Sequence, residues 1–151
     1  MELSYFRAPG DAAVLRGLAD LATFPDFDGV DAKWVGVDAA LDRLVALASG
    51  VAEHVIEERQ VWPATAEPDG PVSAGDPWMT GPFVSEWDVR TRDALAGVSD
   101  EDLPSVAAAW MRGEELDGPA DAGVWQRWVA ALVGVARAAR DSGESLYCSI
   151  A

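Results

Sequence analysis

The sequence contains a single histidine, His54, so a catalytic triad, a Cys–His pair or a zinc site would have to use it. Glu57 and Glu58 follow three and four residues later, in the segment EHVIEE. On a helix the three side chains could share one face, and one histidine with two carboxylates can bind a metal weakly. A lone histidine excludes the HExxH pattern, and a surface histidine in a charged segment is the simpler interpretation. We therefore predict no metal site and keep His54, Glu57 and Glu58 as candidate binding residues.

The only cysteine, Cys148, lies in the closing segment GESLYCSIA and is the remaining candidate nucleophile. Its neighbours alternate as in a strand, which places Cys148 on the same side as two aliphatic residues, Leu146 and Ile150. No positive charge is close in sequence, and a thiol in apolar surroundings has a raised pKa and is inert. We therefore predict a core residue, and no catalytic residue. A single cysteine cannot form an internal disulfide, which fits a reducing cytoplasm.

Three aspartates surround Gly29 in the segment PDFDGVD, a composition that invites comparison with a calcium-binding loop. An EF-hand needs carboxylates at positions 1, 3 and 5, glycine at position 6 and glutamate at position 12. Counted from Asp26, the glycine falls at position 4 and position 12 is Val37, so the pattern fails. We expect Asp26, Asp28 and Asp31 to cap turns and face solvent. The chain also lacks a phosphate-binding loop, a dinucleotide fingerprint and a G-x-S-x-G motif, so no cofactor is predicted.

Residues 63–82 are rich in proline and glycine and are predicted to form a long surface loop. Within it, Trp78 stands beside Met79 in the sequence GDPWMTGP. Aromatic and methionine side chains are favoured at binding surfaces, so both are candidate binding residues. The alternative is that Trp78 folds back and anchors the loop.

Acidic residues outnumber basic ones by 26 to 11, which gives a formal net charge of −15. Such a chain is repelled by phosphate backbones and by anionic membrane surfaces, so we expect neither a nucleic-acid nor a membrane partner. The charge favours a basic protein as partner, and solubility is the alternative explanation. The most apolar stretch, Val129 to Ala136, is too short to span a bilayer, and the start does not look like a secretory signal. A cytoplasmic location is expected.

Hydrophobic periodicity predicts an α+β fold with a strand at each end. Strands are expected over 2–8 and 145–150, and residues 51–62 fit either a strand or a helix. Helices are expected over 12–22, from Asp38 to Gly50, over 86–96 with Ser85 as cap, after Ser99 and Asp102, and over 122–141, which Gly143 ends. The prediction is a single domain over 1–151, in which a small sheet with both terminal strands packs with four to five helices.

Four segments carry a resemblance to a known family: LSYFRA followed by a helix, DAALDRLVALASG, GPFVSEWDV and GESLYCSI. Together they resemble the YfbM-like family of small bacterial proteins, which is built on a domain of unknown function, and a set of actinobacterial proteins that share the closing LYC strand. The positions that match the family's helix are Asp38, Ala40, Leu44, Leu47 and Gly50. Leu41 stands where the family usually has tryptophan. The resemblance implies the fold and carries no activity with it.

These features leave more than one function open. The one we favour is a non-enzymatic protein that binds a basic protein partner, such as an immunity or regulatory protein. The alternative is a small-molecule-binding protein or minor enzyme, with carboxylates and His54 in a pocket near residues 63–82. A third is self-association through terminal strands that form an exposed sheet edge. The oligomeric state is not predicted.

Overall fold

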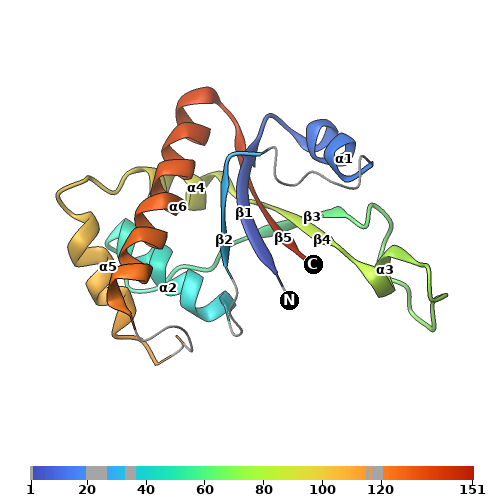
Figure 1. Ribbon diagram of the computed structural model, residues 1–151, viewed down its shortest axis with the longest axis horizontal. Helices are drawn as coiled ribbons and strands as arrows, with labels where there is room; N and C mark the ends of the chain where they lie inside the picture. Colours follow the sequence, from blue (N-terminus) through green and yellow to red (C-terminus); the bar gives the residue numbers. More distant parts are fainter. Residues whose placement is uncertain (1, 20–26, 33–36, 115, 117–120) are drawn as a thin grey trace.

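The computed structural model describes residues 2–19, 27–32, 37–114, 116 and 121–151, which form a five-stranded antiparallel sheet and six helices (Figure 1). This α+β fold confirms the predicted class. The strands are β1 (Leu3–Ala8), β2 (Gly29–Ala32), β3 (Glu58–Trp62), β4 (Phe83–Trp87) and β5 (Ser145–Ile150), and they are ordered β2-β1-β5-β4-β3. The helices are α1 (Asp11–Ala19), α2 (Val37–Ser49), α3 (Pro77–Thr80), α4 (Val89–Ala96), α5 (Leu103–Met111) and α6 (Ala122–Ser142).

The two terminal strands belong to one sheet, as predicted, and lie side by side in its middle. β1 pairs with β5 in a register that sets Tyr5 opposite Cys148. Beyond the strand ends, Glu2 and Ala151 exchange two backbone hydrogen bonds. The edges of the sheet are β2 and β3, so the alternative in which the terminal strands form an exposed edge is wrong.

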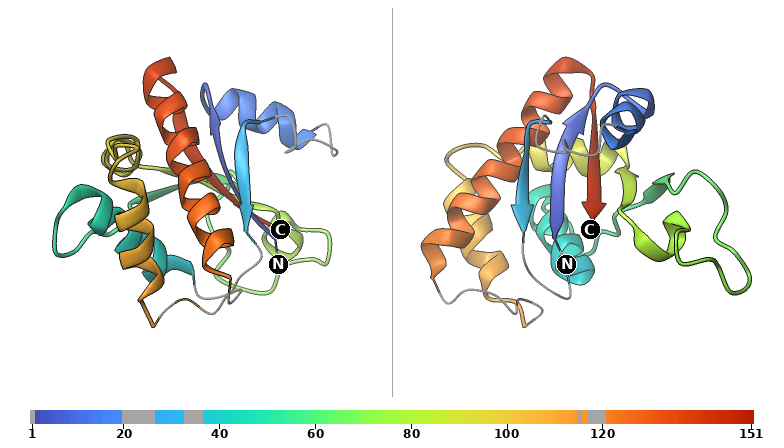
Figure 2. Two further views of the ribbon diagram at one scale, coloured as in Figure 1. Left: turned by 60° about the vertical axis from the view of Figure 1, so that its left-hand side comes forward. Right: turned by 45° about the vertical axis from the view of Figure 1, so that its right-hand side comes forward.

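Helices α2, α4, α5 and α6 lie on one side of the sheet and bury the larger hydrophobic core (Figure 2). The longest of them, α6, starts at the cap residue Asp121 and ends at Gly143, which has the left-handed conformation that favours glycine. Trp110 of α5 is fully buried, and its indole N–H donates to the carbonyl of Ala40 on α2 at 2.7 Å. That bond ties α5 to α2, because a buried indole N–H needs an acceptor.

Of the described helices, α1 alone packs against the opposite face of the sheet (Figure 2). Val14 of α1 is fully buried there, in a second and smaller hydrophobic cluster with strand residues. The other buried members of that cluster are Phe6, Ala8, Val61, Val84 and Tyr147. Since α1 is a short helix of nine residues, it covers one end of this face and leaves the other end without a helix over it.

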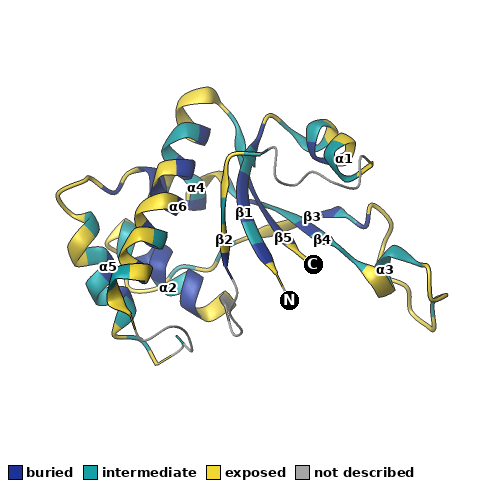
Figure 3. Ribbon diagram, in the orientation of Figure 1, coloured by how far each residue is buried: buried dark blue, intermediate teal, exposed yellow. Residues whose placement is uncertain are grey.

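The main differences from the prediction lie in the middle of the chain. Residues 83–87 form β4, whereas the sequence predicts a helix from Glu86; the cap of α4 is Asp88 and not Ser85. Residues 51–57 form neither helix nor strand, so the helix alternative for this segment is wrong. The strand β2 is unpredicted, as is the short helix α3 within residues 63–82, a segment that is largely exposed (Figure 3). The predicted end of the first helix and Asp26 lie outside the described residues.

Candidate functional site

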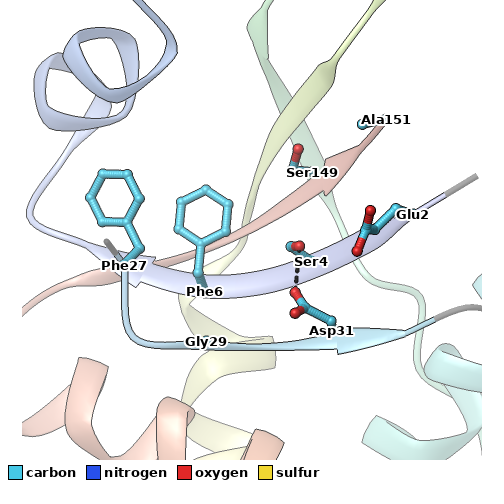
Figure 4. Close-up of a pocket in the computed structure, with 8 residues that line it drawn as sticks. All are labelled: Glu2, Ser4, Phe6, Phe27, Gly29, Asp31, Ser149 and Ala151. Carbon is cyan, nitrogen blue, oxygen red and sulfur yellow. Dashed lines mark hydrogen bonds between the residues drawn. The ribbon is translucent and has the colours of Figure 1, made fainter. Parts of the chain in front are cut away.

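A hollow of about 440 Å³ opens on the sheet face opposite the main helices, beyond the end that α1 covers (Figure 4). The side chains drawn in Figure 4 project from this one side of the sheet. We call this site the sheet hollow. The residues that line it are Glu2, Ser4, Phe6, Phe27, Gly29, Asp31, Ser149 and Ala151.

The strand register places three polar side chains of the sheet hollow in one row. Ser4 of β1 lies opposite Asp31 of β2 on one side and opposite Ser149 of β5 on the other. The Ser4 hydroxyl donates to Oδ1 of Asp31 at 2.6 Å. Among the described residues no other side chain donates to this carboxylate, so its second oxygen can accept a hydrogen bond from a ligand.

Ser149 is the buried polar group of the sheet hollow. It is 4% exposed, and its side chain forms no hydrogen bond with any described residue. The Ser149 oxygen is not fully enclosed by protein, so its hydroxyl can form hydrogen bonds with solvent or with a ligand in the hollow.

Phe6 and Phe27 form an aromatic wall at the end of the sheet hollow that is nearer α1. Their rings stack with centroids 5.0 Å apart and an interplanar angle of 21°. Gly29 makes this packing feasible, since a Cβ at that position would lie 2.8 Å from Cβ of Phe6 and 2.6 Å from the carbonyl oxygen of Tyr5. Any larger residue at position 29 would displace the wall or the edge strand.

A network of charged side chains borders the aromatic wall. Arg59 on β3 pairs with Glu86 on β4 and with Asp11 at the start of α1, and the Tyr147 hydroxyl donates to Asp11 at 3.1 Å. The hydrogen bond from Arg59 lowers the pKa of Asp11 despite the opposing effect of burial, and the bond from Tyr147 adds to the lowering. Burial raises the pKa of Tyr147, so its hydroxyl stays protonated as a donor. These contacts fix α1 to the sheet.

The sheet hollow thus combines carboxylates at Glu2 and Asp31, hydroxyls at Ser4 and Ser149, and two aromatic rings, and none of the described residues that line it is basic. Neither histidine nor cysteine lines it, so it lacks the usual partners for activating a serine nucleophile. This arrangement is therefore suited to binding a ligand. Carboxylates and aromatic faces together attract a cationic group.

His54 lies in a different part of the molecule, where its hydrogen bond stabilises the fold. Its Nε2 lies 3.0 Å from Oγ1 of Thr91, which is fully buried and in turn donates to Oδ2 of Asp88 at 2.8 Å. Because the single hydroxyl proton of Thr91 goes to Asp88, the Nε2–H of His54 is the donor in the first bond. Thr91 is therefore not activated as a nucleophile. The chain of bonds fixes residues 54–57 to the start of α4.

The other predicted site residues do not gather around His54. Glu57 forms an exposed ion pair with Arg90 at 2.8 Å. Glu58, at the start of β3, accepts hydrogen bonds from the indole N–H of Trp87 at 3.0 Å and from the hydroxyl of Ser85 at 2.7 Å. The carboxylate of Glu58 is therefore held in a fixed orientation on the helix side of the sheet, away from the sheet hollow.

Trp78 and Met79 lie on α3, within the exposed 63–82 segment. The indole N–H of Trp78 donates to the hydroxyl of Thr65 at 3.0 Å, and its ring lies 6.0 Å from that of Phe83. These contacts join the two ends of the segment, as an anchor would. Met79 is 61% exposed and remains available to a partner.

Cys148 is buried on β5, with 6% of its surface exposed, as the sequence predicts. Burial raises the pKa of Cys148 to about 12, and the charges of Glu58 and Asp38 add to the effect. The thiol is therefore protonated at neutral pH and is a poor nucleophile.

Sequence reasoning missed the residues that form the sheet hollow. The sequence predicts Asp31 to cap a turn, and Ser4 and Ser149 fall within the two predicted terminal strands without being singled out. The available signal was the alternation in the two terminal strands, which places small polar residues on the face opposite the aliphatic ones. The pairing that brings Asp31 to Ser4 cannot be read from a single sequence.

Comparisons with protein-family models, with curated proteins and with solved structures find no match to this chain. The YfbM-like resemblance stays a prediction. Within the described ranges, no helix is both long and apolar enough to cross a bilayer. In the same ranges, no three histidine, cysteine, aspartate or glutamate side chains are grouped closely enough to hold one metal ion.

Proposed function

We propose that this protein is a non-enzymatic binding module for a basic protein partner, and that the sheet hollow receives a basic side chain of that partner. The proposal rests on the composition of the sheet hollow, whose described lining presents two carboxylates, two hydroxyls and no basic residue. A cationic group that enters the hollow can donate a hydrogen bond to the hydroxyl oxygen of Ser149 and can form an ion pair with the carboxylate of Asp31.

The distribution of charge supports a basic partner. Among the described residues, six arginines bond to carboxylates of the same chain, which neutralises them locally: Arg7, Arg59, Arg90, Arg92, Arg137 and Arg140. Because acidic residues outnumber basic ones, many carboxylates remain available to attract an external partner. A surface of this kind accelerates association with a basic protein and makes the rate sensitive to salt.

Arginine is the side chain that fits the sheet hollow best. Its planar guanidinium can stack on Phe27, which is partly exposed, while its N–H groups reach Asp31 and Ser149. An immunity or regulatory protein that captures a basic toxin is one concrete form of this function, and a toxin gene beside this one would favour it. A single buried cysteine suits a cytoplasmic protein of this kind.

The proposal is tested by capturing partners from a lysate of the source organism on the immobilised protein at low salt, followed by elution at high salt. The informative variant is Glu2→Gln/Asp31→Asn, which removes two charges from the sheet hollow. The matched control is Asp93→Asn/Asp141→Asn, which removes two exposed charges from α4 and α6. We expect a basic protein to be retained by the wild type and the control and lost from the hollow variant. Retention of the same protein by all three would refute the assignment of the site.

A further inference from the structure

The chain between β3 and α3 extends beyond the end of the sheet and contains neither helix nor strand (Figure 1). Every residue from 64 to 75 is exposed except Val72, which is half-buried. We call residues 64–75 the exposed loop. Exposed loop tips with small and polar residues are the preferred sites of proteolytic cleavage in folded proteins.

The middle of the exposed loop is not bonded to the rest of the protein. Residues 66–72 form no hydrogen bond or ion pair with any described residue. The nearest side-chain bond joins the Thr65 hydroxyl to the indole N–H of Trp78, and the nearest backbone bond joins the carbonyl of Ser73 to the N–H of Asp76. An endopeptidase must bind several consecutive residues in an extended form. Here it can do so without first breaking an internal hydrogen bond.

Residues 51–57 provide an internal comparison, because they also lack regular structure and are largely exposed. Their backbone, however, is bonded to neighbouring elements. The N–H groups of Val51 and Ile56 donate to acceptors on α2, and Glu57 exchanges two hydrogen bonds with Asp88. Cleavage in 51–57 requires these bonds to break, so the exposed loop is the more susceptible of the two segments.

The sequence of the exposed loop determines which class of endopeptidase can cut it. No lysine or arginine occurs between Arg59 and Arg90, so a trypsin-like enzyme has no site there. The bonds that precede Pro68 and Pro71 are tertiary amides, which most endopeptidases do not cleave. An elastase-like enzyme has a small specificity pocket that accepts small aliphatic side chains. The loop presents four of these: Ala64, Ala66, Val72 and Ala74.

The topology of the sheet determines what happens after a cut in the exposed loop. The N-terminal chain would carry β1, β2 and β3, and the C-terminal chain would carry β4 and β5. Since the strand order is β2-β1-β5-β4-β3, the two strands of the C-terminal chain lie between β1 and β3 of the other chain. Separation of the chains would break both the β1–β5 and the β3–β4 pairings.

The helices join the two chains on one face of this interleaved sheet. In the larger hydrophobic core, α2 of the N-terminal chain packs with α4, α5 and α6 of the C-terminal chain. The buried bond from Trp110 to the carbonyl of Ala40 crosses between them, as do the two backbone bonds between Glu2 and Ala151. Neither chain retains this core alone, so burial of apolar surface holds the cut protein together.

We propose that the exposed loop is a site of limited proteolysis by an elastase-like endopeptidase, and that the cut protein persists as two interlocked chains. In this step water adds to one peptide bond, the C–N bond breaks, and a new carboxylate and a new amino group form. The sheet hollow contains Glu2 and Asp31 from one chain and Ser149 from the other, so it survives the cut only while the chains stay together. The proposal is independent of what the sheet hollow binds.

The test is digestion of the native full-length protein with pancreatic elastase, followed by mass spectrometry under denaturing conditions and size-exclusion chromatography under native ones. We expect a bond within 64–75 to be cut before any bond within 51–57, and the fragments to elute together at the volume of the intact protein. The melting temperature of the cut protein should be lower than that of the intact protein. It should also rise with protein concentration, because unfolding now separates two chains.

The informative variant replaces the four small aliphatic residues of the exposed loop: Ala64→Gln/Ala66→Gln/Val72→Gln/Ala74→Gln. The matched control is Ala52→Gln, an exposed position in 51–57. We expect cleavage of the loop to be at least about tenfold slower in the loop variant and unchanged in the control, because glutamine does not fit a small specificity pocket. Thermal unfolding shows whether each variant is folded, and the digestion of the wild type stands without them. Earlier cleavage in 51–57, equal rates in wild type and loop variant, or separate elution of the fragments overturns the proposal.

Discussion

Asp88 is the residue whose loss should reveal how residues 54–57, which lack regular structure, are held in place. Its carboxylate caps α4 by accepting from the backbone N–H of Thr91, and it also accepts from the Thr91 hydroxyl and from the N–H of Glu57. Burial by itself raises the pKa of Asp88, but the hydrogen bonds from Thr91 and Glu57 and the charge of Arg90 outweigh it, so the pKa is lowered. The carboxylate is therefore stabilised in its ionised form.

The cost of Asp88→Ala follows from these three bonds. Loss of a helix N-cap costs about 1 kcal/mol. The Thr91 hydroxyl is fully buried but can redirect its proton to His54 once that ring changes tautomer, so this bond adds at most about 1 kcal/mol. The N–H of Glu57 is exposed, and water replaces its acceptor at little cost. We expect a total of about 2 kcal/mol, or a decrease of about 4–8 °C in the melting temperature.

The assay is urea unfolding followed by circular dichroism, with Asp100→Ala as the matched control. Asp100 is also paired with an arginine, Arg137, but its side chain is 86% exposed and caps no helix of the described chain. The control should cost no more than about 0.5 kcal/mol. The loss of stability in Asp88→Asn should fall between those of the two alanine variants. Asparagine caps helices well, but its side-chain NH2 group donates where an oxygen of the carboxylate accepts. Equal destabilisation by Asp88→Ala and Asp100→Ala would show that the hydrogen bonds of Asp88 do not stabilise the protein more than an exposed ion pair does.

Three further predictions concern protonation and the buried polar groups. Asp11 and Asp88 both have lowered pKa values, so the stability they contribute is complete above their unfolded pKa of about 3.9 and is lost as the pH falls through the folded values. The free energy of unfolding should thus fall more steeply with decreasing pH below about 4 in the wild type than in Asp88→Asn, and parallel curves would contradict this. Ser149→Ala should change the free energy of unfolding by less than about 0.5 kcal/mol, because no internal hydrogen bond is lost; a cost above about 1 kcal/mol would reveal an internal partner. Cys148 should react slowly with a thiol reagent in the native protein and rapidly after unfolding in urea, and fast labelling of the native protein would show that its thiol is accessible.

The parts of the fold that the sequence predicts well are those whose signals are local. The end of α6 follows from Gly143, and β5 follows from the alternation around Cys148. β4 is missed because Ser85 and Asp88, three residues apart, resemble a helix capping box. In the structure Ser85 faces Glu58 on the neighbouring strand, and Asp88 alone is the cap. Pairing with a strand distant in sequence overrides the local pattern there.

The candidate sites depend on arrangements that a single sequence does not contain. Ser4, Asp31 and Ser149 meet because β1 pairs with both β2 and β5, in a register set by the whole sheet. Glu58 was predicted as a binding residue together with His54, since both lie in one charged segment. In the structure His54 contacts Thr91 on α4, whereas Glu58 accepts hydrogen bonds from Ser85 and Trp87 on β4.

The central claim, that the sheet hollow receives an arginine side chain, is tested most directly by NMR mapping with a short arginine-containing peptide. The matched probe replaces arginine by citrulline, which has nearly the same shape and no charge. We expect the arginine peptide to shift the backbone amides of Ser4, Asp31 and Ser149, the citrulline peptide to leave them unchanged, and the shifts to vanish in Glu2→Gln/Asp31→Asn. Equal shifts from both peptides, or shifts confined to residues outside the sheet hollow, would contradict it.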